Sequence, residues 1–404
     1  MKLLVVSINY APEPTGTGLY TGGLCAALAA RGHDVSVVCG YPFYPEWRVH
    51  PGYRAWWWST ERVDGVRLLR CPVYVPAQVN GLKRLLHYAS FALSSLPVLL
   101  WLLLFDRPRA FLCIAPTLMA ATLPAPVARL LGVRTWIHIQ DFEVEAGFAT
   151  DQLKSGSLVG KAAMLFERLS FRFYDFASTI SPAMVAKLKT KVAPGVPVAQ
   201  LRNWAEIDAI RVQSESAYRS EWAIATPHVA LYSGSIAKKQ GIDMLIDVAR
   251  ELEARGDTTV IICGNGPEKD QLAALAEGVS NIQLRPLQPM ERLGDLLALA
   301  TVHLLPQKKD AADLVLPSKM ANMLASGRPI VAGAAADTSL AGEIEGCGVA
   351  VEPENAAAMA AAIGRLIDDE AGRARSGAAA RKRAEDHWAK GAIIDNFESA
   401  AGSL

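Results

Sequence analysis

Short runs of apolar residues alternate with helical patterns along the whole chain. The predicted strands are Leu3–Ile8, Val35–Cys39, Val66–Cys71, Ala110–Ile114, Thr135–Ile139 and Phe176–Ile180 in the first half, then His228–Tyr232, Thr258–Cys263, Asn281–Leu284, Val302–Leu305, Pro329–Ala332 and Val349–Val351. Helical patterns such as Leu19–Arg31, Thr117–Leu131 and Leu158–Phe173 lie between some of them. Continuous apolar strands that alternate with helices are typical of parallel sheets covered on both faces. The pattern therefore predicts an α/β protein.

The two series of strands meet at a seam near residues 200–210, and 404 residues suit two domains. We expect two doubly wound, Rossmann-like domains that face each other across a cleft, with ligands at the carboxyl ends of the strands. The predicted domains are residues 1–203 and 204–385. Residues 386–404 are expected to form a C-terminal helix that packs back on the first domain.

One segment departs from the pattern of a soluble protein. From Tyr88 to Phe105 there are 18 residues without a charge, which is near the shortest length that can span a bilayer. Pro97 and three serines argue against a span, whereas the basic pair Lys83-Arg84 and the triad Trp56-Trp57-Trp58 fit a seat at a membrane surface. A long buried helix is the third alternative. We assign 85–105 to a membrane-facing part of the first domain, and expect Leu99, Leu100 and Leu103 to make its contacts.

Charge is distributed unevenly along the chain. The net charge is only +1, which argues against a dedicated nucleic-acid-binding protein. Residues 1–200 hold 20 Lys and Arg against 12 Asp and Glu, whereas the remainder holds 21 against 28. The basic half suggests an anionic partner, such as a membrane surface or a phosphorylated acceptor. The six cysteines form no CxxC pair, and the N-terminus matches a first strand better than a signal peptide, so we expect a cytoplasmic protein.

Glycine-rich turns follow several of the predicted strands. The first contains Gly16, Thr17 and Gly18 and precedes a helix, which is an arrangement that can bind a phosphate or form a plain tight turn. It is not the dinucleotide-binding GxGxxG pattern, because Thr21 stands where the third glycine belongs. In the second half, three further turns carry small or cationic residues, namely Ser235, Lys238 and Lys239, then Gly264 and Gly266, then Pro317, Ser318 and Lys319. Each could be a solvated turn, but three in one domain favour a diphosphate site.

The loop after the strand Thr135–Ile139 gathers ionisable side chains. His138, Asp141 and Glu143 lie close together there, and Glu145 follows. An imidazole or a carboxylate can take a proton from a hydroxyl group, so we predict these three residues as catalytic, with Glu143 as a further base candidate. The alternatives are that the carboxylates only cap the next element, or that the HxxD spacing binds a metal ion. We expect no metal.

Four motifs follow one another along the chain, namely YAPEPTGTG, SGS-x3-KQG, GNGP and LPSK…ASGRP. Together they resemble the family 4 retaining glycosyltransferases of the GT-B fold, and the resemblance covers nearly the whole chain. The stretches IHIQDFEVEAGF and AADLVLPSKMANMLASGRPIV look like a narrower group, the bacterial colanic-acid and O-antigen type transferases, including L-fucosamine transferases. The resemblance implies that the second domain binds a nucleotide-sugar donor and the first domain an acceptor.

The resemblance also implies roles for individual residues. Gly16 and Gly18, with Thr17, would face the donor diphosphate, and Ser235, Lys238 or Lys239, Pro317, Ser318 and Lys319 would contact its phosphates. Gly264 and Gly266 would shape the donor pocket, and His138 would lie near the reacting sugar. Many members carry two glutamates eight positions apart, where this chain has Leu314 and Asn322. We expect Asp313 or Asp310 to take over a contact with a sugar hydroxyl, and count Asn322 among the donor-binding residues.

The resulting hypothesis is a retaining hexosyltransferase of bacterial surface polysaccharide synthesis. It would move a sugar, an N-acetylated deoxy sugar such as L-FucNAc, from a UDP-sugar to a polyprenyl-diphosphate-linked saccharide. It would work at the cytoplasmic surface of the inner membrane, without metal, cofactor or nucleic acid. The alternatives are a sugar-nucleotide epimerase of the same fold and a non-catalytic membrane-associated scaffold.

Overall fold

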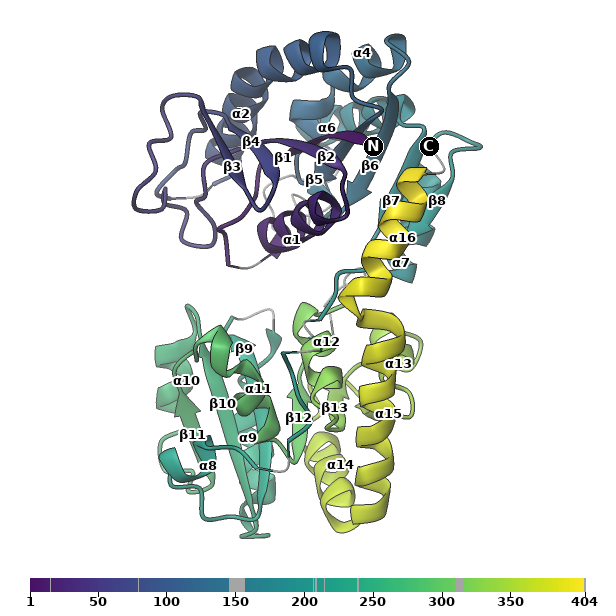
Figure 1. The fold of residues 1–404 in the computed structure, drawn as a ribbon. Helices are drawn as coiled ribbons and strands as arrows, with labels where there is room; N and C mark the ends of the chain where they lie inside the picture. The colour runs from purple at the N-terminus through teal and green to yellow at the C-terminus, as the bar shows by residue number, and fades with distance from the viewer. Residues whose placement is uncertain are drawn as a thin grey trace. The chain divides into compact units, whose positions relative to one another are not determined.

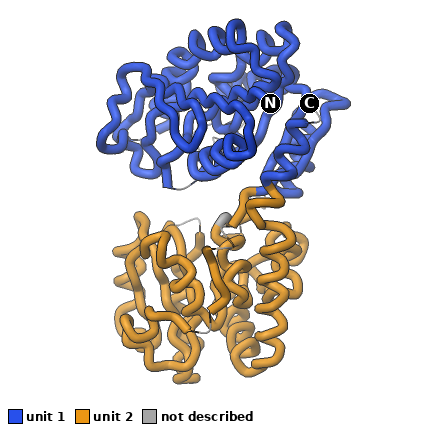
Figure 2. The backbone as a smooth tube through the Cα atoms, viewed as in Figure 1, with its two compact units in different colours: residues 1–202, 394–404 blue, residues 203–393 orange. Residues whose placement is uncertain are grey.

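The computed structural model describes residues 1–14, 16–78, 80–144, 157–205, 207, 209–213, 215–237, 240–309 and 316–402, with only the backbone of Ser318. The chain forms two units, which Figure 2 distinguishes by colour. Unit 1 contains residues 1–202 and 394–404, and unit 2 contains residues 203–393. Each unit is built around one sheet.

The sheet of unit 1 has eight strands in the order β3-β4-β2-β1-β5-β6-β7-β8 (Figure 1). Its strands are β1 (Lys2–Ser7), β2 (Asp34–Cys39), β3 (Ser59–Val63), β4 (Val66–Arg70), β5 (Ala110–Ala115), β6 (Arg134–Ile139), β7 (Phe176–Thr179) and β8 (Val198–Gln200). All neighbours are parallel except β3 and β4. The central strands are almost entirely buried, because helices lie on both faces of the sheet. All six strands predicted in this half are confirmed.

Helices connect these strands. They are α1 (Gly16–Ala30), α2 (Gly81–Trp101), η1 (Leu102–Asp106), α3 (Leu118–Ala121), α4 (Pro124–Leu130), α6 (Leu158–Ser170), η2 (Phe171–Phe173) and α7 (Pro182–Lys191). Asn80, Ser157 and Ser181 each accept a hydrogen bond from a backbone N–H in the first turn of α2, α6 and α7, and so fix where these helices begin.

The sheet of unit 2 has six parallel strands in the order β11-β10-β9-β12-β13-β14. They are β9 (His228–Ser235), β10 (Thr258–Asn265), β11 (Ile282–Arg285), β12 (Val302–Leu305), β13 (Ile330–Gly333) and β14 (Gly348–Val351), so the six strands predicted here are confirmed. The helices are α8 (Tyr218–Glu221), α9 (Met244–Glu253), α10 (Lys269–Leu275), η4 (Met290–Arg292), α11 (Leu293–Ala298), α12 (Ser318–Ala325), α13 (Ser339–Ile344), α14 (Ala356–Asp368) and α15 (Glu370–Trp388). The fold class is therefore two Rossmann-like α/β units.

The last helix, α16 (Lys390–Gly402), ends the chain within unit 1 (yellow in Figure 1). Phe397 is buried and stacks on Trp136 of β6 at a ring-centroid distance of 5.7 Å. Glu398 accepts hydrogen bonds from Arg31 at 2.7 Å and pairs with His33 at the same distance. Helix α16 thus packs on one face of the unit 1 sheet, at β6.

Helix α2 and η1 bury only one side of their apolar surface. The helical segment Gly81–Asp106 is long and apolar enough to cross a membrane, yet only 28% of an apolar 18-residue stretch within it is buried. Leu99 and Leu103 are fully buried, whereas Leu93, Trp101 and Phe105 are 73%, 49% and 70% exposed. The expectation that Leu99 and Leu103 make the outward contacts was wrong, because these side chains fill the core of unit 1. The exposed stripe also disfavours the alternative of a fully buried helix.

Candidate functional site

Two glycines bring the carboxyl ends of β9 and β10 into unusually close contact. A Cβ atom added to Gly264 would lie 1.9 Å from the carbonyl oxygen of Gly234, and one added to Gly266 would lie 2.1 Å from that of Ile236. Neither position has room for a side chain, since the atoms in the way belong to the backbone. The glycines therefore let two strand ends form one narrow corner of unit 2.

Lys319 lies in the first turn of α12 and points into this corner. Its Nζ atom donates a hydrogen bond to the Tyr232 hydroxyl at 2.8 Å and lies 4.0 Å from the centre of that ring. A Cβ atom on Gly234 would be 3.3 Å from Cδ of Lys319, so the glycine also makes room for the lysine. Burial lowers the pKa of Lys319 to about 7.

No carboxylate within the described part of the chain forms an ion pair with Lys319. Its other hydrogen-bond partner is the side-chain oxygen of Gln240, at 3.5 Å. A cation that is desolvated without a counter-charge favours an anionic ligand, because the ligand would supply the missing charge. The corner is therefore electrostatically suited to a phosphate group.

The start of α12 adds backbone donors to the same corner. Pro317 stands immediately before the helix, and the helix begins at Ser318. The first N–H groups of a helix have no intrahelical acceptor and attract anions. Asn322 lies four residues after Ser318, about one helical turn further along α12, and is half-buried. The predicted Pro317, Ser318, Lys319 and Asn322 are thus gathered on one helix.

Some predicted residues cannot be located. Lys238, Lys239 and Asp313 lie outside the described residues, as do Asp310, Leu314 and Glu145, and only the backbone of Ser318 is described. Ser235 is exposed at the end of β9. The donor roles predicted for all of these residues stay predictions.

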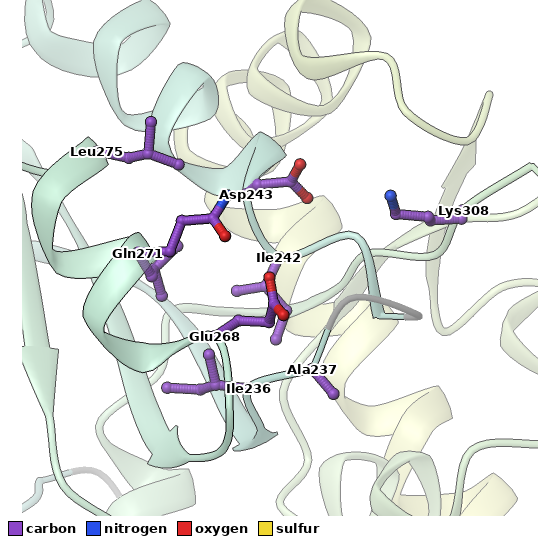
Figure 3. A pocket seen from close by; sticks show the side chains of 9 residues that line it. Ile236, Ala237, Ile242, Asp243, Glu268, Gln271, Leu275 and Lys308 are labelled. Carbon is purple, nitrogen blue, oxygen red and sulfur yellow. The ribbon is translucent and has the colours of Figure 1, made fainter.

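A small pocket borders the same corner (Figure 3). It has a volume of roughly 200 Å³, and Ile236, Ile242 and Leu272 form its apolar part. Glu268 and Gln271 stand on one side, while Lys308 lies apart from them. Ile236 connects the pocket to the corner, because its carbonyl oxygen is the atom that Gly266 approaches. A mixture of apolar and hydrogen-bonding groups suits an uncharged part of a ligand better than a phosphate.

In unit 1 the turn after β1 is organised by Glu13, which the sequence did not single out. Its Oε1 atom accepts hydrogen bonds from the backbone N–H groups of Phe43 and Tyr44, both at 3.1 Å, and its Oε2 atom accepts one from Asn9 at 3.0 Å. Burial raises the pKa of this carboxyl group. A Cβ atom on Gly18 would lie 2.4 Å from Oε2 of Glu13, so the glycine is needed to make room for the carboxylate.

Gly16 differs from Gly18. It is exposed, it adopts a φ of +66°, and a Cβ atom on it would lie 3.5 Å from the Tyr44 ring. Gly16 is therefore the glycine of this turn that leaves backbone accessible at the start of α1, together with the half-buried Thr17. Their predicted contact with a diphosphate stays a prediction. Only the position of Glu13 between two prolines, in a loop that needs a fixed shape, could have drawn attention to it.

The predicted catalytic histidine is enclosed in unit 1. His138 is 1% exposed, with Nδ1 2.9 Å from the Ser178 hydroxyl, Nε2 3.1 Å from the Gln140 amide nitrogen and its ring against Phe397. Burial lowers its pKa to about 3, so the ring is neutral. A neutral ring with both nitrogens engaged suits the positioning of Gln140 better than direct proton transfer. The predicted catalytic role is not tested by this arrangement and stays a prediction.

The two carboxylates of the same loop have different surroundings. Asp141 is exposed, whereas Glu143 accepts a hydrogen bond from the backbone N–H of Leu118, at the start of α3, at 2.7 Å. Burial raises the pKa of Glu143 to about 7. Glu143 thus caps a helix, although not the next one in sequence. In the described part of the chain, no group of three or more His, Cys, Asp or Glu side chains is arranged to hold a metal ion.

Comparisons with known proteins agree with this architecture. Residues 15–204 match the model of a glycosyl transferase 4-like domain, and residues 227–369 match that of the glycosyl transferases group 1. The chain is 39% identical over 383 residues to the colanic acid biosynthesis glycosyl transferase WcaI of Escherichia coli (strain K12), covering 91% of this chain and 92% of that protein.

Two solved structures share the fold over the full length of this chain. Sucrose-phosphate synthase from Thermosynechococcus elongatus has a TM-score of 0.74 at 14% identity and is covered to 99%. HepE from Anabaena, in complex with UDP and glucose, has a TM-score of 0.68 at 15% identity and is covered to 100%.

Proposed function

We propose a specific reaction for this chain, which belongs to the GT-B glycosyltransferases, an enzyme family that uses nucleotide sugars. Its first domain is a glycosyl transferase 4-like domain, and its second belongs to the glycosyl transferases group 1. It transfers a sugar from a UDP-sugar, with retention, to a polyprenyl-diphosphate-linked saccharide in the synthesis of a bacterial surface polysaccharide. An N-acetylated deoxy sugar such as L-FucNAc is the first donor sugar to test. The reaction takes place at the cytoplasmic surface of the inner membrane.

The observation that carries this proposal is the environment of Lys319. Its ammonium group is desolvated at the start of α12, beside the strand ends that Gly234 and Gly264 hold together, and no described carboxylate pairs with it. Transfer from a nucleoside diphosphate sugar places negative charge on the leaving diphosphate in the transition state. A preorganised cation and the helix N–H groups stabilise that charge more than they stabilise the bound ground state. We propose that these groups take the place of a metal ion.

The choice of UDP rests on a weaker argument. HepE, which shares the fold, binds UDP and glucose. At 15% identity this likeness extends to the fold alone, so the nucleotide base must be tested directly.

The experiment is donor turnover with a panel of UDP-, GDP- and dTDP-sugars, with and without a membrane lipid extract. We expect turnover with a UDP-sugar only when lipid is present, with transfer of labelled sugar into the lipid fraction. Formation of an epimer without lipid would support the epimerase alternative instead. Lys319→Ala should lose turnover, whereas Lys382→Ala, an exposed lysine of α15 that pairs with Asp386, should keep it.

Membrane attachment is the second part of the proposal, and the exposed face of α2 supports it. Leu93, Trp101 and Phe105 form an apolar stripe at spacings of eight and four residues. Trp58 donates a hydrogen bond from its indole nitrogen to the Ser94 carbonyl at 3.0 Å, which holds the exposed tryptophan triad beside the middle of this helix. An apolar face with tryptophans is typical of a helix that lies in the plane of a membrane surface.

Basic residues lie close in sequence to the tryptophan triad and to η1. Arg54, Arg62 and Arg107 are exposed on the segments next to the triad and after η1. Arginine side chains there would be attracted to anionic lipids. The charge supports a lipid partner over a second apolar protein surface.

Sedimentation with phosphatidylcholine vesicles that contain phosphatidylglycerol tests this part. Replacing Leu93, Trp101 and Phe105 together by Ser should weaken vesicle binding by at least about tenfold, because three apolar side chains lose their burial in lipid. The matched control is Leu287→Ser with Met290→Ser, two exposed apolar residues of unit 2. If both variants bind vesicles like the wild type, the helix is not the attachment surface.

A further inference from the structure

A second hollow lies at the opposite edge of the unit 2 sheet from Lys319. It has a volume of about 850 Å³, and its lining includes His228, the first residue of β9, and Thr301, which immediately precedes β12. The amino ends of parallel strands share one edge of a sheet, and the carboxyl ends share the other. The hollow is therefore separate from the corner that holds Lys319.

Three arginines from different elements line this hollow. Arg219 lies in α8, Arg328 precedes β13 and Arg373 lies in α15. Burial is the main cause of the lowered pKa of Arg328 and of His228, and the charge of Arg373 lowers both further, with a smaller effect of Arg219 on His228. Asp257 raises the pKa of His228, but it is paired with Arg255. Because all three arginines line the same hollow, one ligand there can meet more than one cation.

The arginines are held in position by backbone carbonyl groups. Arg219 donates to Thr226 and Pro227, and Arg373 donates to Leu366 and Ile367. Arg328 donates to the carbonyl oxygen of Gln213 at 2.7 Å. Carbonyl oxygens fix the direction of a guanidinium group, but they do not neutralise its charge.

The carboxylates near the hollow leave an excess of positive charge. Asp295 is already occupied, because it pairs with Arg292 at 2.8 Å and accepts the N–H of Ala217. Glu215 is exposed. Within the described part of the chain, no carboxylate forms an ion pair with Arg219, Arg328 or Arg373.

The burial of Arg328 adds an independent indication. Its Nε–H is buried without a hydrogen-bond partner among the described residues, and the guanidinium group is half-buried beside a second cation. Such an arrangement is unfavourable unless an anion shares the site, since each cation raises the cost of the other.

We propose that this hollow is a second anion site of unit 2 and that it takes a small phosphate-bearing molecule, such as diphosphate. Guanidinium groups suit this ligand, because their planar N–H groups can bind two phosphate oxygens at once. The inference is independent of the proposed transferase reaction, since it concerns the other edge of the sheet.

The test uses the full chain carrying Lys319→Ala, so that the donor corner contributes little. Sodium diphosphate is titrated calorimetrically, with sodium sulfate at matched ionic strength as the reference anion. We expect diphosphate to bind, and Arg373→Gln or Arg219→Gln added to this background to weaken binding by about tenfold each. Arg250→Gln should have no effect, because Arg250 of α9 also donates to a backbone carbonyl, that of Leu275, but lies outside the hollow.

The remaining outcomes are also decisive. UDP is titrated into the same variants, because Lys319→Ala weakens the donor corner without abolishing it. UDP binding that the arginine variants weaken identifies a nucleotide source, whereas weakened diphosphate binding with unchanged UDP binding identifies a free phosphate ligand; either result supports the site. The proposal is overturned if Lys319→Ala abolishes diphosphate binding, or if both arginine variants bind it as tightly as their parent. Two separate arginine variants are needed because Arg373 also caps the end of α14.

Discussion

The strand ends of the two units handle charge in opposite ways. In unit 2, Lys319 is desolvated, and its partners among the described residues, Tyr232 and Gln240, are neutral. In unit 1, His138 lies near the end of β6 and Glu143 lies shortly after it. His138 is hydrogen-bonded inside the fold, and Glu143 caps α3. Both sites lie at carboxyl ends of parallel strands, namely β9 and β10 in unit 2 and β6 in unit 1. An ionisable residue at a strand end thus indicates a ligand site only when its charge is left without a partner.

The largest expected effect comes from closing the unit 2 corner. Gly264→Val should lower the free energy of unfolding by about 2–3 kcal/mol and abolish nucleotide binding, because the new side chain meets the Gly234 carbonyl and cannot be accommodated. Urea denaturation and UDP titration measure the two effects. The control is Gly342→Ala in α13, where a Cβ atom meets nothing within 4 Å. Normal UDP binding by Gly264→Val would show that the corner is not the donor site.

The next effect concerns Lys319 itself, which pairs with no carboxylate in the described part of the chain. Lys319→Ala should weaken UDP binding by about 1.5–3 kcal/mol, which is the range for a hydrogen bond to a charged group. Stability should change little or improve, because the variant removes a desolvated charge. Isothermal titration with UDP measures the loss. If Lys319→Ala binds UDP as tightly as the wild type, Lys319 is not part of the nucleotide site, and its charge does not distinguish unit 2 from unit 1.

The lysine also predicts a pH dependence. Its pKa of about 7 in the free protein means that it is charged below pH 7 and loses its proton above it. An anionic ligand favours the charged form, so UDP-glucose affinity should fall as the pH rises from 6 to 8.5, by at most tenfold per pH unit. UDP-glucose is chosen because its diphosphate does not titrate in this range. Lys319→Arg should flatten the profile.

The smallest effect is expected at the satisfied strand end. The pKa of Glu143 is about 7 in the fold, above the ordinary value of 4.5, so the folded state binds this proton more tightly than the unfolded state does. The resulting stabilisation is present below pH 4.5 and is lost as the pH rises to 7. Glu143→Gln should therefore be more stable than the wild type at pH 8, by about 1–2 kcal/mol, and similar at pH 4.5. Equal stability at both pH values would contradict the burial of this group.

The sequence predicted the buried strands well, because a short continuous apolar run between turns is typical of a strand that is buried on both faces. It missed β3, which is exposed on both faces and has no apolar run, although Asp64 and Gly65 form the tight turn between β3 and β4 with φ angles of +48° and +80°. An Asp-Gly pair between two short segments is a hairpin signal that could have been used. It also missed β8, a strand of only three residues.

The site was predictable by residue type but not by environment. Glycine turns and Lys319 were found from their positions after strands. The lowered pKa of Lys319 and the enclosure of His138 could not be, because both depend on side chains distant in sequence, such as Tyr232 and Phe397. The outward face of α2 was also misassigned, since the uncharged stretch from Tyr88 to Phe105 offers no charged position that marks its exposed side.

The helix α16 has a consequence for how the protein is made. Unit 1 is assembled from residues 1–202 and 394–404, so Phe397 can reach Trp136 only after all of unit 2 has been synthesised. A domain whose chain is continuous can finish folding while the ribosome is still at work. Here the first unit to leave the ribosome is the last to be completed, and a clone that stops at residue 202 would lack the aromatic ring that covers β6.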